Sequence, residues 1–381
     1  MRQCRLLAVI LLLSFHGLSV AGETPLQKSL ATVDPQTGVA WFDARDIGVE
    51  GKAWDDTEAF YDRLPARAKA VVRSPVWNLS RQTAGMCVRF ASNAPSLHVR
   101  WQLTSDRLAM AHMPATGVSG VDLYVHTDDG WRWLAVGQPT ATANDVRLIK
   151  DIASQRRTYL LYLPLYNGVA SLEIGIPQGS KLWPQQVEPT DGKPIVFWGT
   201  SITQGGCASR PGMVHTAILG RRLSRPIINL GFSGNGKMEP EVAQLIAEID
   251  AAAFVIDCLP NLKSEAVAKR TQPLVSILRK QHSRTPILLV EDRSYTNAFL
   301  IERQRLRNQQ SRVALRSAFT ELQQAGVPAL YYLSGNELLG SDGEDTVDGS
   351  HPTDLGFLRQ ANAFEPVIRK MLEQKIQHVN Q

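Results

Sequence analysis

The sequence is poor in the residues that hold metals and disulfide frameworks. Only four of its 381 residues are cysteines, and no two of them form a C-x-x-C pair. Histidine is similarly scattered, with no H-x-x-x-H spacing, so a zinc site is not expected. A chain of this length with so few cysteines is also not a disulfide-stapled scaffold. Its glycine-rich runs match neither a dinucleotide fingerprint nor a P-loop, and we therefore expect no metal or organic cofactor.

The chain also lacks an excess of charge of one sign. It has 41 basic and 36 acidic residues, and removal of an N-terminal leader that carries Arg2 and Arg5 would leave 39 basic residues. Nucleic-acid binding requires a concentrated basic footprint, which this near-balance does not supply. We expect no nucleic-acid partner.

Long apolar runs are missing except at the N-terminus. Arg2 and Arg5 precede the apolar run 6–15, and the small residues 19–21 follow it. This order is typical of a secretory signal peptide with cleavage after residue 21, and the run is too short to span a bilayer comfortably. An uncleaved N-terminal anchor is the alternative. The sequence thus predicts a signal peptide over residues 1–21 and a secreted or periplasmic protein without stable membrane insertion.

Residues 24–190 have the pattern of an antiparallel β-domain. Short runs of alternating apolar and polar residues recur, and turn residues such as 127–130 separate them. Many short strands without an intervening helix favour a β-sandwich, here expected to be jelly-roll-like. The predicted strands cover residues 87–90, 97–101, 121–125, 131–134, 159–163 and 171–176.

Beyond a proline-rich linker at 177–194, the pattern changes to alternating strands and helices. Such alternation predicts an α/β domain, over residues 191–378, whose parallel sheet is covered by helices on both faces. The strands are expected at 194–198, 227–230, 253–257, 287–291 and 329–333. The helices are expected at 213–224, 239–249, 264–281, 301–325 and 354–374.

Polar residues with catalytic chemistry follow several of these strands. Ser201 comes directly after the first strand, Gly234 follows the second, and Asn261 follows the third. Asp348 and His351 stand three apart before the last helix. Because sites in parallel sheets lie at the carboxyl ends of the strands, we expect these residues to converge. Each has an ordinary structural explanation alone, but together they supply a nucleophile, oxyanion donors, a base and a base-orienting carboxylate.

In this order and spacing, the second half resembles the SGNH (GDSL-type) esterases over about 194–374. Thr200 stands where the family most often has Asp, and no Asp follows Asn261. A short segment of the first half resembles the GxDLY signature of a β-domain fused to such esterases. The residues that carry the resemblance are Gly199-Thr200-Ser201, Asn229-x-Gly231-x-x-Gly234, Asn261, Asp348-x-x-His351 and, for the β-domain, Gly120-x-Asp122-Leu123-Tyr124.

The resemblance implies a flavodoxin-like hydrolase domain and a role for each residue. Ser201 is expected to be the nucleophile, His351 the base and Asp348 its orienting partner. The oxyanion hole is expected to consist of the N–H groups of Ser201 and Gly234 and the side chain of Asn261.

We therefore expect a secreted serine esterase that removes small acyl groups, acetyl in particular, from an acetylated oligo- or polysaccharide. A lipase or lysophospholipase of the same family is the enzymatic alternative. A non-catalytic carbohydrate-binding protein is the alternative from another class, and the intact set of Ser201, Asp348 and His351 argues against it.

Three further groups leave open questions. Cys207 and Cys258 both flank the expected site, where they form either a disulfide or two buried free thiols. Residues 291–293, Glu-Asp-Arg, lie at the active edge and either contact substrate or form a surface ion pair. Trp131 and Trp133 are interpreted as core residues of the sandwich.

Overall fold

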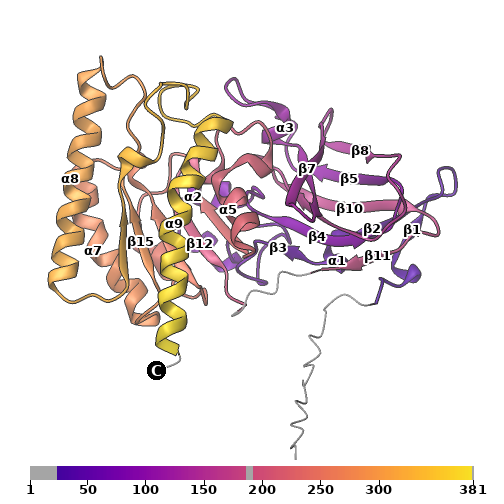
Figure 1. Ribbon diagram of the computed structural model, residues 1–381, viewed down its shortest axis with the longest axis horizontal. Coiled ribbons are helices and arrows are strands. Elements are labelled where there is room, and N and C mark those ends of the chain that lie inside the picture. The colour runs from indigo at the N-terminus through magenta and orange to yellow at the C-terminus, as the bar shows by residue number, and fades with distance from the viewer. Residues whose placement is uncertain (1–23, 186–191, 380–381) are drawn as a thin grey trace, which may run out of the picture.

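The computed structural model describes residues 24–185 and 192–379 and contains two halves that lie side by side (Figure 1). The expected signal peptide and part of the expected linker lie outside these ranges. Among the described helices, none is long and apolar enough to cross a membrane. The first half is built mainly from strands, and the second from strands alternating with helices.

The N-terminal half is a sandwich of two antiparallel sheets, as the sequence predicted. One sheet has the order β1-β2-β10-β5-β8, and the other has the order β11-β4-β9-β6-β7, with β3 beside β4. The strands are β1 (Thr32–Val33), β2 (Val39–Asp43), β3 (Val49–Glu50), β4 (Cys87–Ser92), β5 (Leu97–Leu103), β6 (Val121–Thr127), β7 (Gly130–Gly137), β8 (Ala143–Ile149), β9 (Arg157–Tyr162), β10 (Val169–Pro177) and β11 (Leu182–Pro184).

Alternation of side chains explains why these strands form a sandwich. Along β5, every second residue from Leu97 to Leu103 is buried, so one face of the strand lies against the other sheet. Trp101 on one sheet and Phe90 on the other belong to the same buried cluster. Because β11 pairs with β4, the chain leaves the sandwich only after Pro184, later than the expected start of the linker at 177.

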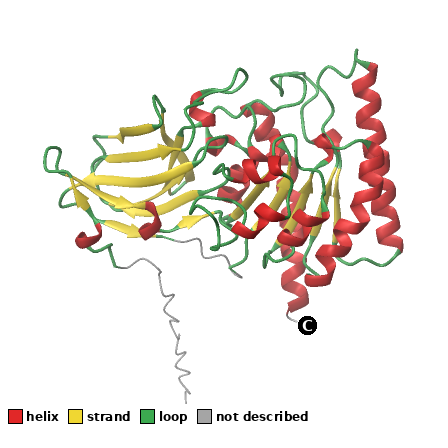
Figure 2. Ribbon diagram, turned by 180° about the vertical axis from the view of Figure 1, so that it is seen from behind, coloured by secondary structure: helices red, strands yellow, loops and turns green. Residues whose placement is uncertain are grey.

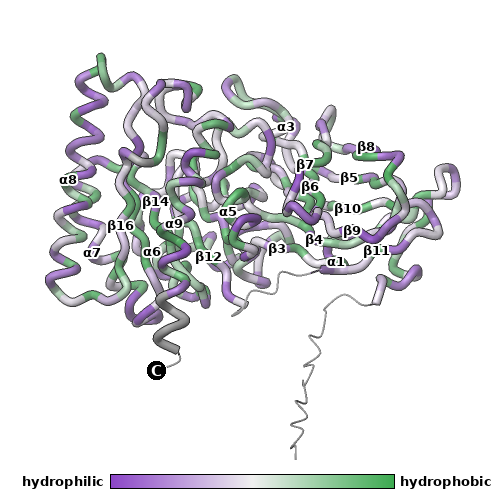
Figure 3. The backbone as a smooth tube through the Cα atoms, in the orientation of Figure 1, coloured by the Kyte–Doolittle hydropathy of each residue, from purple (hydrophilic) through white to green (hydrophobic). Residues whose placement is uncertain are grey.

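The C-terminal half contains a five-stranded parallel sheet with the order β13-β12-β14-β15-β16. This is the flavodoxin-like order, with β12 first in the chain and second in the sheet. Every residue of β12, β13, β14 and β15 is buried, and Figure 3 shows hydrophobic residues following the strands. All five predicted strands are present, as β12 (Ile195–Gly199), β13 (Ile227–Gly231), β14 (Ala253–Asp257), β15 (Ile287–Val290) and β16 (Leu330–Leu333).

Helices cover both faces of this sheet, which confirms the α/β prediction (Figure 2). Side chains of α5 and α9 form a buried cluster with one face, while those of α6, α7 and α8 pack on the other. The helices of this half are α4 (Ser201–Gln204), α5 (His215–Leu223), α6 (Pro240–Ile246), α7 (Ser264–Gln281), α8 (Glu302–Gln324) and α9 (Asp354–Val379).

The two halves share a hydrophobic core, which the sequence did not predict. The chain between β3 and β4 leaves the sandwich and places Leu64, Val76 and Trp77 in the cluster that covers one face of the parallel sheet. Val76 and Trp77 belong to the α-helix α2 (Ser74–Ser80); the described part of the first half also contains the short α-helices α1 (Ala44–Ile47) and α3 (Ala115–Val118).

A buried arginine reinforces this junction. One Nη atom of Arg63 donates to the carbonyl oxygens of Asn229 (3.1 Å) and Gly231 (2.7 Å) at the end of β13. Its other nitrogens donate to the carbonyls of Leu79 and Gln82, each at 2.7 Å. Burial lowers the pKa of Arg63 to about 9, which still leaves it charged at neutral pH. The N-terminal segment is thereby fixed to the strand that precedes Gly234.

We predict that the shared core stabilises both halves together. Leu64 has no exposed surface, so Leu64→Ala should lower the free energy of unfolding by about 2–5 kcal/mol. The matched control is Val71→Ala, because Val71 lies nearby but is 53% exposed, and its cost should stay below about 0.5 kcal/mol. Chemical denaturation followed by circular dichroism measures both. An unchanged midpoint for Leu64→Ala would show that the contact is dispensable.

Candidate active site

Ser201 is the first residue of α4, immediately after β12. Thr200 caps this short helix, and its hydroxyl accepts a hydrogen bond from the N–H of Ile202 (3.3 Å). A threonine can thus serve as the N-cap, a position that aspartate also favours. The helix ends after one turn at Gly205, whose φ of 115° is one that glycine adopts without strain. Ser201 therefore sits at the carboxyl edge of the sheet on a tight strand-to-helix turn.

The structure brings Ser201, His351 and Asp348 together in a continuous hydrogen-bond chain. Ser201 Oγ lies 2.8 Å from Nε2 of His351, and Nδ1 of the same ring lies 2.7 Å from Oδ2 of Asp348. The Ser201 residue is 7% exposed, whereas the side chains of His351 and Asp348 are 26% and 44% exposed. Ser201 is thus largely enclosed, while the His351 side chain is partly open to solvent.

Asp348 is held in place by the backbone that follows it. Its Oδ1 accepts hydrogen bonds from the N–H groups of Ser350 (3.0 Å) and His351 (2.8 Å). Burial raises the pKa of Asp348, but hydrogen bonds from the backbone and ring of His351 outweigh this effect and bring the pKa below its ordinary value. The carboxylate is ionised at neutral pH and can stabilise a positively charged imidazole.

The two other expected oxyanion donors lie on neighbouring loops. Gly234 is exposed and has a φ of 67° in the turn after β13. Asn261 follows β14, and its Oδ1 accepts a hydrogen bond from the N–H of Gly236 (3.2 Å), which leaves its amide NH₂ group available to donate. Over the described ranges, the N–H groups of Ser201 and Gly234 have no recorded acceptor. Their role in an oxyanion hole stays a prediction.

Close backbone contacts explain two of the glycines. A Cβ atom at Gly231 would lie 2.1 Å from the backbone nitrogen of Gln204 in α4. At Gly236 it would lie 2.0 Å from the carbonyl oxygen of Gly199. The chain segments that follow β12 and β13 therefore pack directly against each other at glycines where a side chain would collide with the backbone.

A buried ion pair is hydrogen-bonded to α4, the short helix that begins with Ser201. The guanidinium of Arg293 forms two hydrogen bonds with Asp257, one of them 2.8 Å long, and both side chains are at most 2% exposed. Asp257 in turn accepts a hydrogen bond from the hydroxyl of Thr203 in α4 (3.1 Å). Of the alternatives for residues 291–293, the ion pair applies to Arg293, and Asp292 likewise pairs with Arg307. The expected location on the surface is wrong, because Asp292 and Arg293 are both buried.

We predict that this pair matters for stability. Arg293→Gln leaves the Asp257 carboxylate buried without its cation, which should cost about 3–5 kcal/mol in the free energy of unfolding. The control is Arg305→Gln, since the Arg305–Glu302 pair is exposed, with a separation of 3.3 Å, and should contribute less than about 1 kcal/mol. Denaturant titration of both variants distinguishes them. Equal losses would contradict the assignment of a supporting role to the buried pair.

Two side chains from the β-domain reach the site, and sequence reasoning missed both. The hydroxyl of Tyr166, just beyond β9, donates to the carbonyl oxygen of Ser201 (3.2 Å). The exposed ring of His112 lies with its centroid 5.9 Å from that of His351. Neither residue belongs to a motif or to a periodic pattern, so the sequence offered no means of finding them.

The GxDLY segment lies at the contact between the halves. Asp122 Oδ2 accepts hydrogen bonds from the side chain of Arg210 (2.9 Å) and the N–H of Gly212 (2.8 Å). Both of these residues lie in the segment that follows α4. Trp133 donates to the other carboxylate oxygen (3.0 Å). The interpretation of Trp133 as a core residue is wrong. It lies beside this contact and is 50% exposed.

Two questions remain for the site, namely the state of the cysteines and the presence of a metal-binding group. Cys87, Cys207 and Cys258 are free and buried, which fits the free-thiol alternative rather than the disulfide. Within residues 24–185 and 192–379, no three His, Cys, Asp or Glu side chains are grouped so that they could hold a metal ion.

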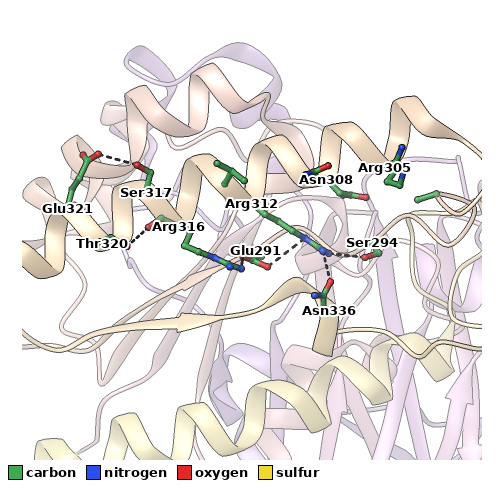
Figure 4. Close-up of a pocket in the computed structure, with 13 residues that line it drawn as sticks. Glu291, Ser294, Arg305, Asn308, Arg312, Arg316, Ser317, Thr320, Glu321 and Asn336 are labelled. Carbon is green, nitrogen blue, oxygen red and sulfur yellow. Dashed lines mark hydrogen bonds and ion pairs between the residues drawn. The ribbon is translucent and has the colours of Figure 1, made fainter.

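A cavity of about 640 Å³ opens along α8. Its lining includes Glu291 but none of the residues expected to form the catalytic triad or the oxyanion hole. Figure 4 shows Arg312 and Arg316 extending from this helix toward Glu291. Glu291 is fully buried and also accepts hydrogen bonds from the hydroxyl of Tyr332 (2.5 Å) and the N–H of Gly335 (2.8 Å). Its carboxylate is therefore occupied by protein donors.

Family models match both halves of the chain. Residues 192–369 match the model of the GDSL-like lipase/acylhydrolase family, and residues 39–182 match the model of the GxDLY N-terminus of SGNH-hydrolase-type esterases. A comparison with curated proteins found no match.

Among solved structures, a GDSL-like lipase from Bacteroides ovatus is 33% identical, with a TM-score of 0.84 over 88% of this chain and 98% of that chain. A salicylyl-acyltransferase from a tetracycline biosynthetic pathway is 16% identical, with a TM-score of 0.67 over 90% and 97%. A family two carbohydrate esterase from Cellvibrio japonicus is 13% identical, with a TM-score of 0.56 over 88% and 98%. The last two likenesses show a common fold.

Proposed function

The chain belongs to the SGNH (GDSL-type) ester hydrolases, and from that premise we propose that it is an exported serine esterase that acts through Ser201, His351 and Asp348. Its proposed substrates are small acyl esters, acetyl esters in particular, on oligo- or polysaccharides. The observation that carries the catalytic part is the unbroken hydrogen-bond chain from Asp348 through His351 to Ser201 Oγ.

The proposed reaction begins when Nε2 of His351 accepts the hydroxyl proton as Ser201 Oγ attacks the ester carbonyl. Ionised Asp348 holds the ring through Nδ1 and stabilises the imidazolium. The N–H groups of Ser201 and Gly234 and the Asn261 side chain stabilise the oxyanion. His351 then protonates the departing alcohol, and a water molecule deprotonated by the same ring hydrolyses the acyl-enzyme.

Polar groups at the rim support a polyol as the alcohol part of the ester. The alcohol must leave next to His351, whose exposed neighbour His112 supplies a second imidazole. The side chain of Asn297 lies beside Gly349, and Gly349 belongs to the loop that carries Asp348. Such groups can form hydrogen bonds to sugar hydroxyls. The carbohydrate esterase from C. japonicus adds an analogy of fold alone. The site, and not the fold, determines the substrate.

One observation favours the alternative of a lipase or lysophospholipase. Phe299 and Leu300, on the loop between β15 and α8, are each 80% exposed. The same loop contacts the catalytic segment, because the N–H of Thr296 donates to the carbonyl of Gly349 (2.9 Å). Exposed apolar side chains near an active site are typical of enzymes that act at lipid surfaces.

Ser201→Ala tests the nucleophile. We expect it to abolish the hydrolysis of p-nitrophenyl acetate and the pre-steady-state burst, because no other side chain would then carry the acyl group. The far-ultraviolet circular dichroism spectrum and the thermal midpoint should stay close to those of the wild type. Turnover near the wild-type rate in a folded variant would refute the assignment.

Asn261→Ala tests the oxyanion hole. The loss of one preorganised donor should lower kcat by about 10²–10³-fold, with a much smaller change in KM, because the oxyanion exists only in the transition state. Steady-state kinetics with p-nitrophenyl acetate provide both constants. A raised KM with unchanged kcat would identify Asn261 as a ground-state binding residue instead.

The substrate class is tested with two series of esters. We expect kcat/KM to fall from p-nitrophenyl acetate through the butyrate to the palmitate, and acetate to be released from an acetylated polysaccharide. Ser201→Ala provides the background rate for both. A preference for palmitate, lost when Phe299 and Leu300 are both changed to serine, would favour the lipase alternative.

A further inference from the structure

We propose that Tyr166 of the β-domain is a positioning residue that holds Ser201 and the loop carrying Gly234 in their reactive arrangement. This inference rests on the proposed function, and it makes the β-domain a working part of the catalytic site. It concerns the rate of the reaction and not only the recognition of a polymeric substrate.

Tyr166 is itself rigidly placed within the β-domain. Its N–H donates to the carbonyl oxygen of Val118 (3.0 Å), and the N–H of Leu165 donates to that of Gly117 (3.2 Å). The segment that follows β9 is therefore tied to α3. A side chain fixed in this way can serve as a reference point for residues of the other half.

The carbonyl group of Ser201 is the point that Tyr166 holds. Besides the Tyr166 hydroxyl (3.2 Å), it accepts hydrogen bonds from the N–H groups of Gly205 (2.9 Å) and Gly206 (2.7 Å). A Cβ atom at Gly206 would lie 3.0 Å from that hydroxyl and 3.2 Å from Cδ2 of His351. The Tyr166 hydroxyl thus lies in the immediate surroundings of both the nucleophile and the base.

The same β-domain segment also reaches the oxyanion loop through Gln204. The side-chain amide of Gln204 donates to the carbonyl of Leu165 (3.1 Å), and its Oε1 accepts from the N–H of Ser233 (3.0 Å). Ser233 immediately precedes Gly234. Leu165 and Tyr166 are therefore linked both to Ser201 and to the residue before the second oxyanion donor.

The hydroxyl is suited to act as a permanent donor. Burial raises the pKa of Tyr166, although the positive charge of Arg63 acts in the opposite direction. The phenol consequently stays protonated at neutral pH. Without the Tyr166 hydroxyl, the Ser201 carbonyl would keep only its bonds to Gly205 and Gly206, within its own turn. The β-domain would then no longer fix the placement of the Ser201 and Gly234 N–H groups through this contact.

Tyr166→Phe in the full-length chain tests the inference, with Tyr162→Phe as the matched control. Tyr162 on β9 likewise has a hydroxyl that crosses to the other half, where it donates to the carbonyl of Ala217 (3.3 Å) and accepts from the guanidinium of Arg221 (3.2 Å). Both variants lose one tyrosine hydroxyl at the junction, and the thermal midpoint of Tyr162→Phe, which loses two contacts, should fall at least as far as that of Tyr166→Phe. Only Tyr166→Phe removes a contact to Ser201.

For p-nitrophenyl acetate, Tyr166→Phe should lower kcat by about tenfold, with KM within about twofold of the wild type, because misplaced catalytic groups affect the transition state. The rate at which a phosphonate labels Ser201 should fall in parallel. Tyr162→Phe should retain wild-type kcat and labelling. Should Tyr166→Phe fail to fold, Gln204→Ala, which removes the hydrogen bonds that link the same β-domain segment to Ser233, should lower kcat in the same direction.

Wild-type kcat in folded Tyr166→Phe, or an equal loss of kcat in both tyrosine variants, would overturn the positioning role. If the wild-type chain itself neither hydrolyses the ester nor is labelled at Ser201, the proposed function fails instead. The two failures are thus distinguishable in one set of measurements.

Discussion

The hydrogen bond between Ser201 Oγ and Nε2 of His351 is the contact on which the rest of the site depends. It spans 2.8 Å and joins two loops that are 150 residues apart in the chain. A parallel sheet brings such loops close together, because the carboxyl ends of its strands lie at the same edge. The strand order places β12, which carries Ser201, next to both β13 and β14, so the loops with Gly234 and Asn261 flank the serine. The segment before α9 then returns to this edge with Asp348 and His351.

The second constraint is the attachment of the N-terminal half. Arg63 donates hydrogen bonds to carbonyl groups at the end of β13. Asp122 accepts hydrogen bonds from Arg210 and from the backbone N–H of Gly212, in the segment that follows α4. Burying an arginine or an aspartate is unfavourable unless hydrogen bonds compensate for lost hydration. These contacts therefore fix the orientation of the halves, and the shared core around Leu64 adds hydrophobic burial to them. The β-domain is consequently part of the framework of the site.

Much of the architecture could be predicted from the sequence because it has local causes. Continuous apolar runs gave all five strands of the parallel sheet, and the spacing of Asp348 and His351 placed them on one short loop. Contacts between distant segments could not be predicted in this way. Tyr166 and Leu64 lie in stretches without periodicity, and their partners are in the other half of the chain. Trp133 was misassigned because its strand pattern did not show that its indole would donate to Asp122 at the contact between the halves while half of the side chain stays exposed.

The central claim is that Ser201 is a nucleophile activated by His351, and covalent labelling tests it most directly. Full-length protein treated with a p-nitrophenyl phosphonate should gain the mass of one phosphonyl group, and peptide mapping should place that group on Ser201. The same treatment of His351→Ala should proceed far more slowly, because the hydroxyl would lack its base. Labelling at another residue, or labelling of Ser201 at an unchanged rate without His351, would contradict the account.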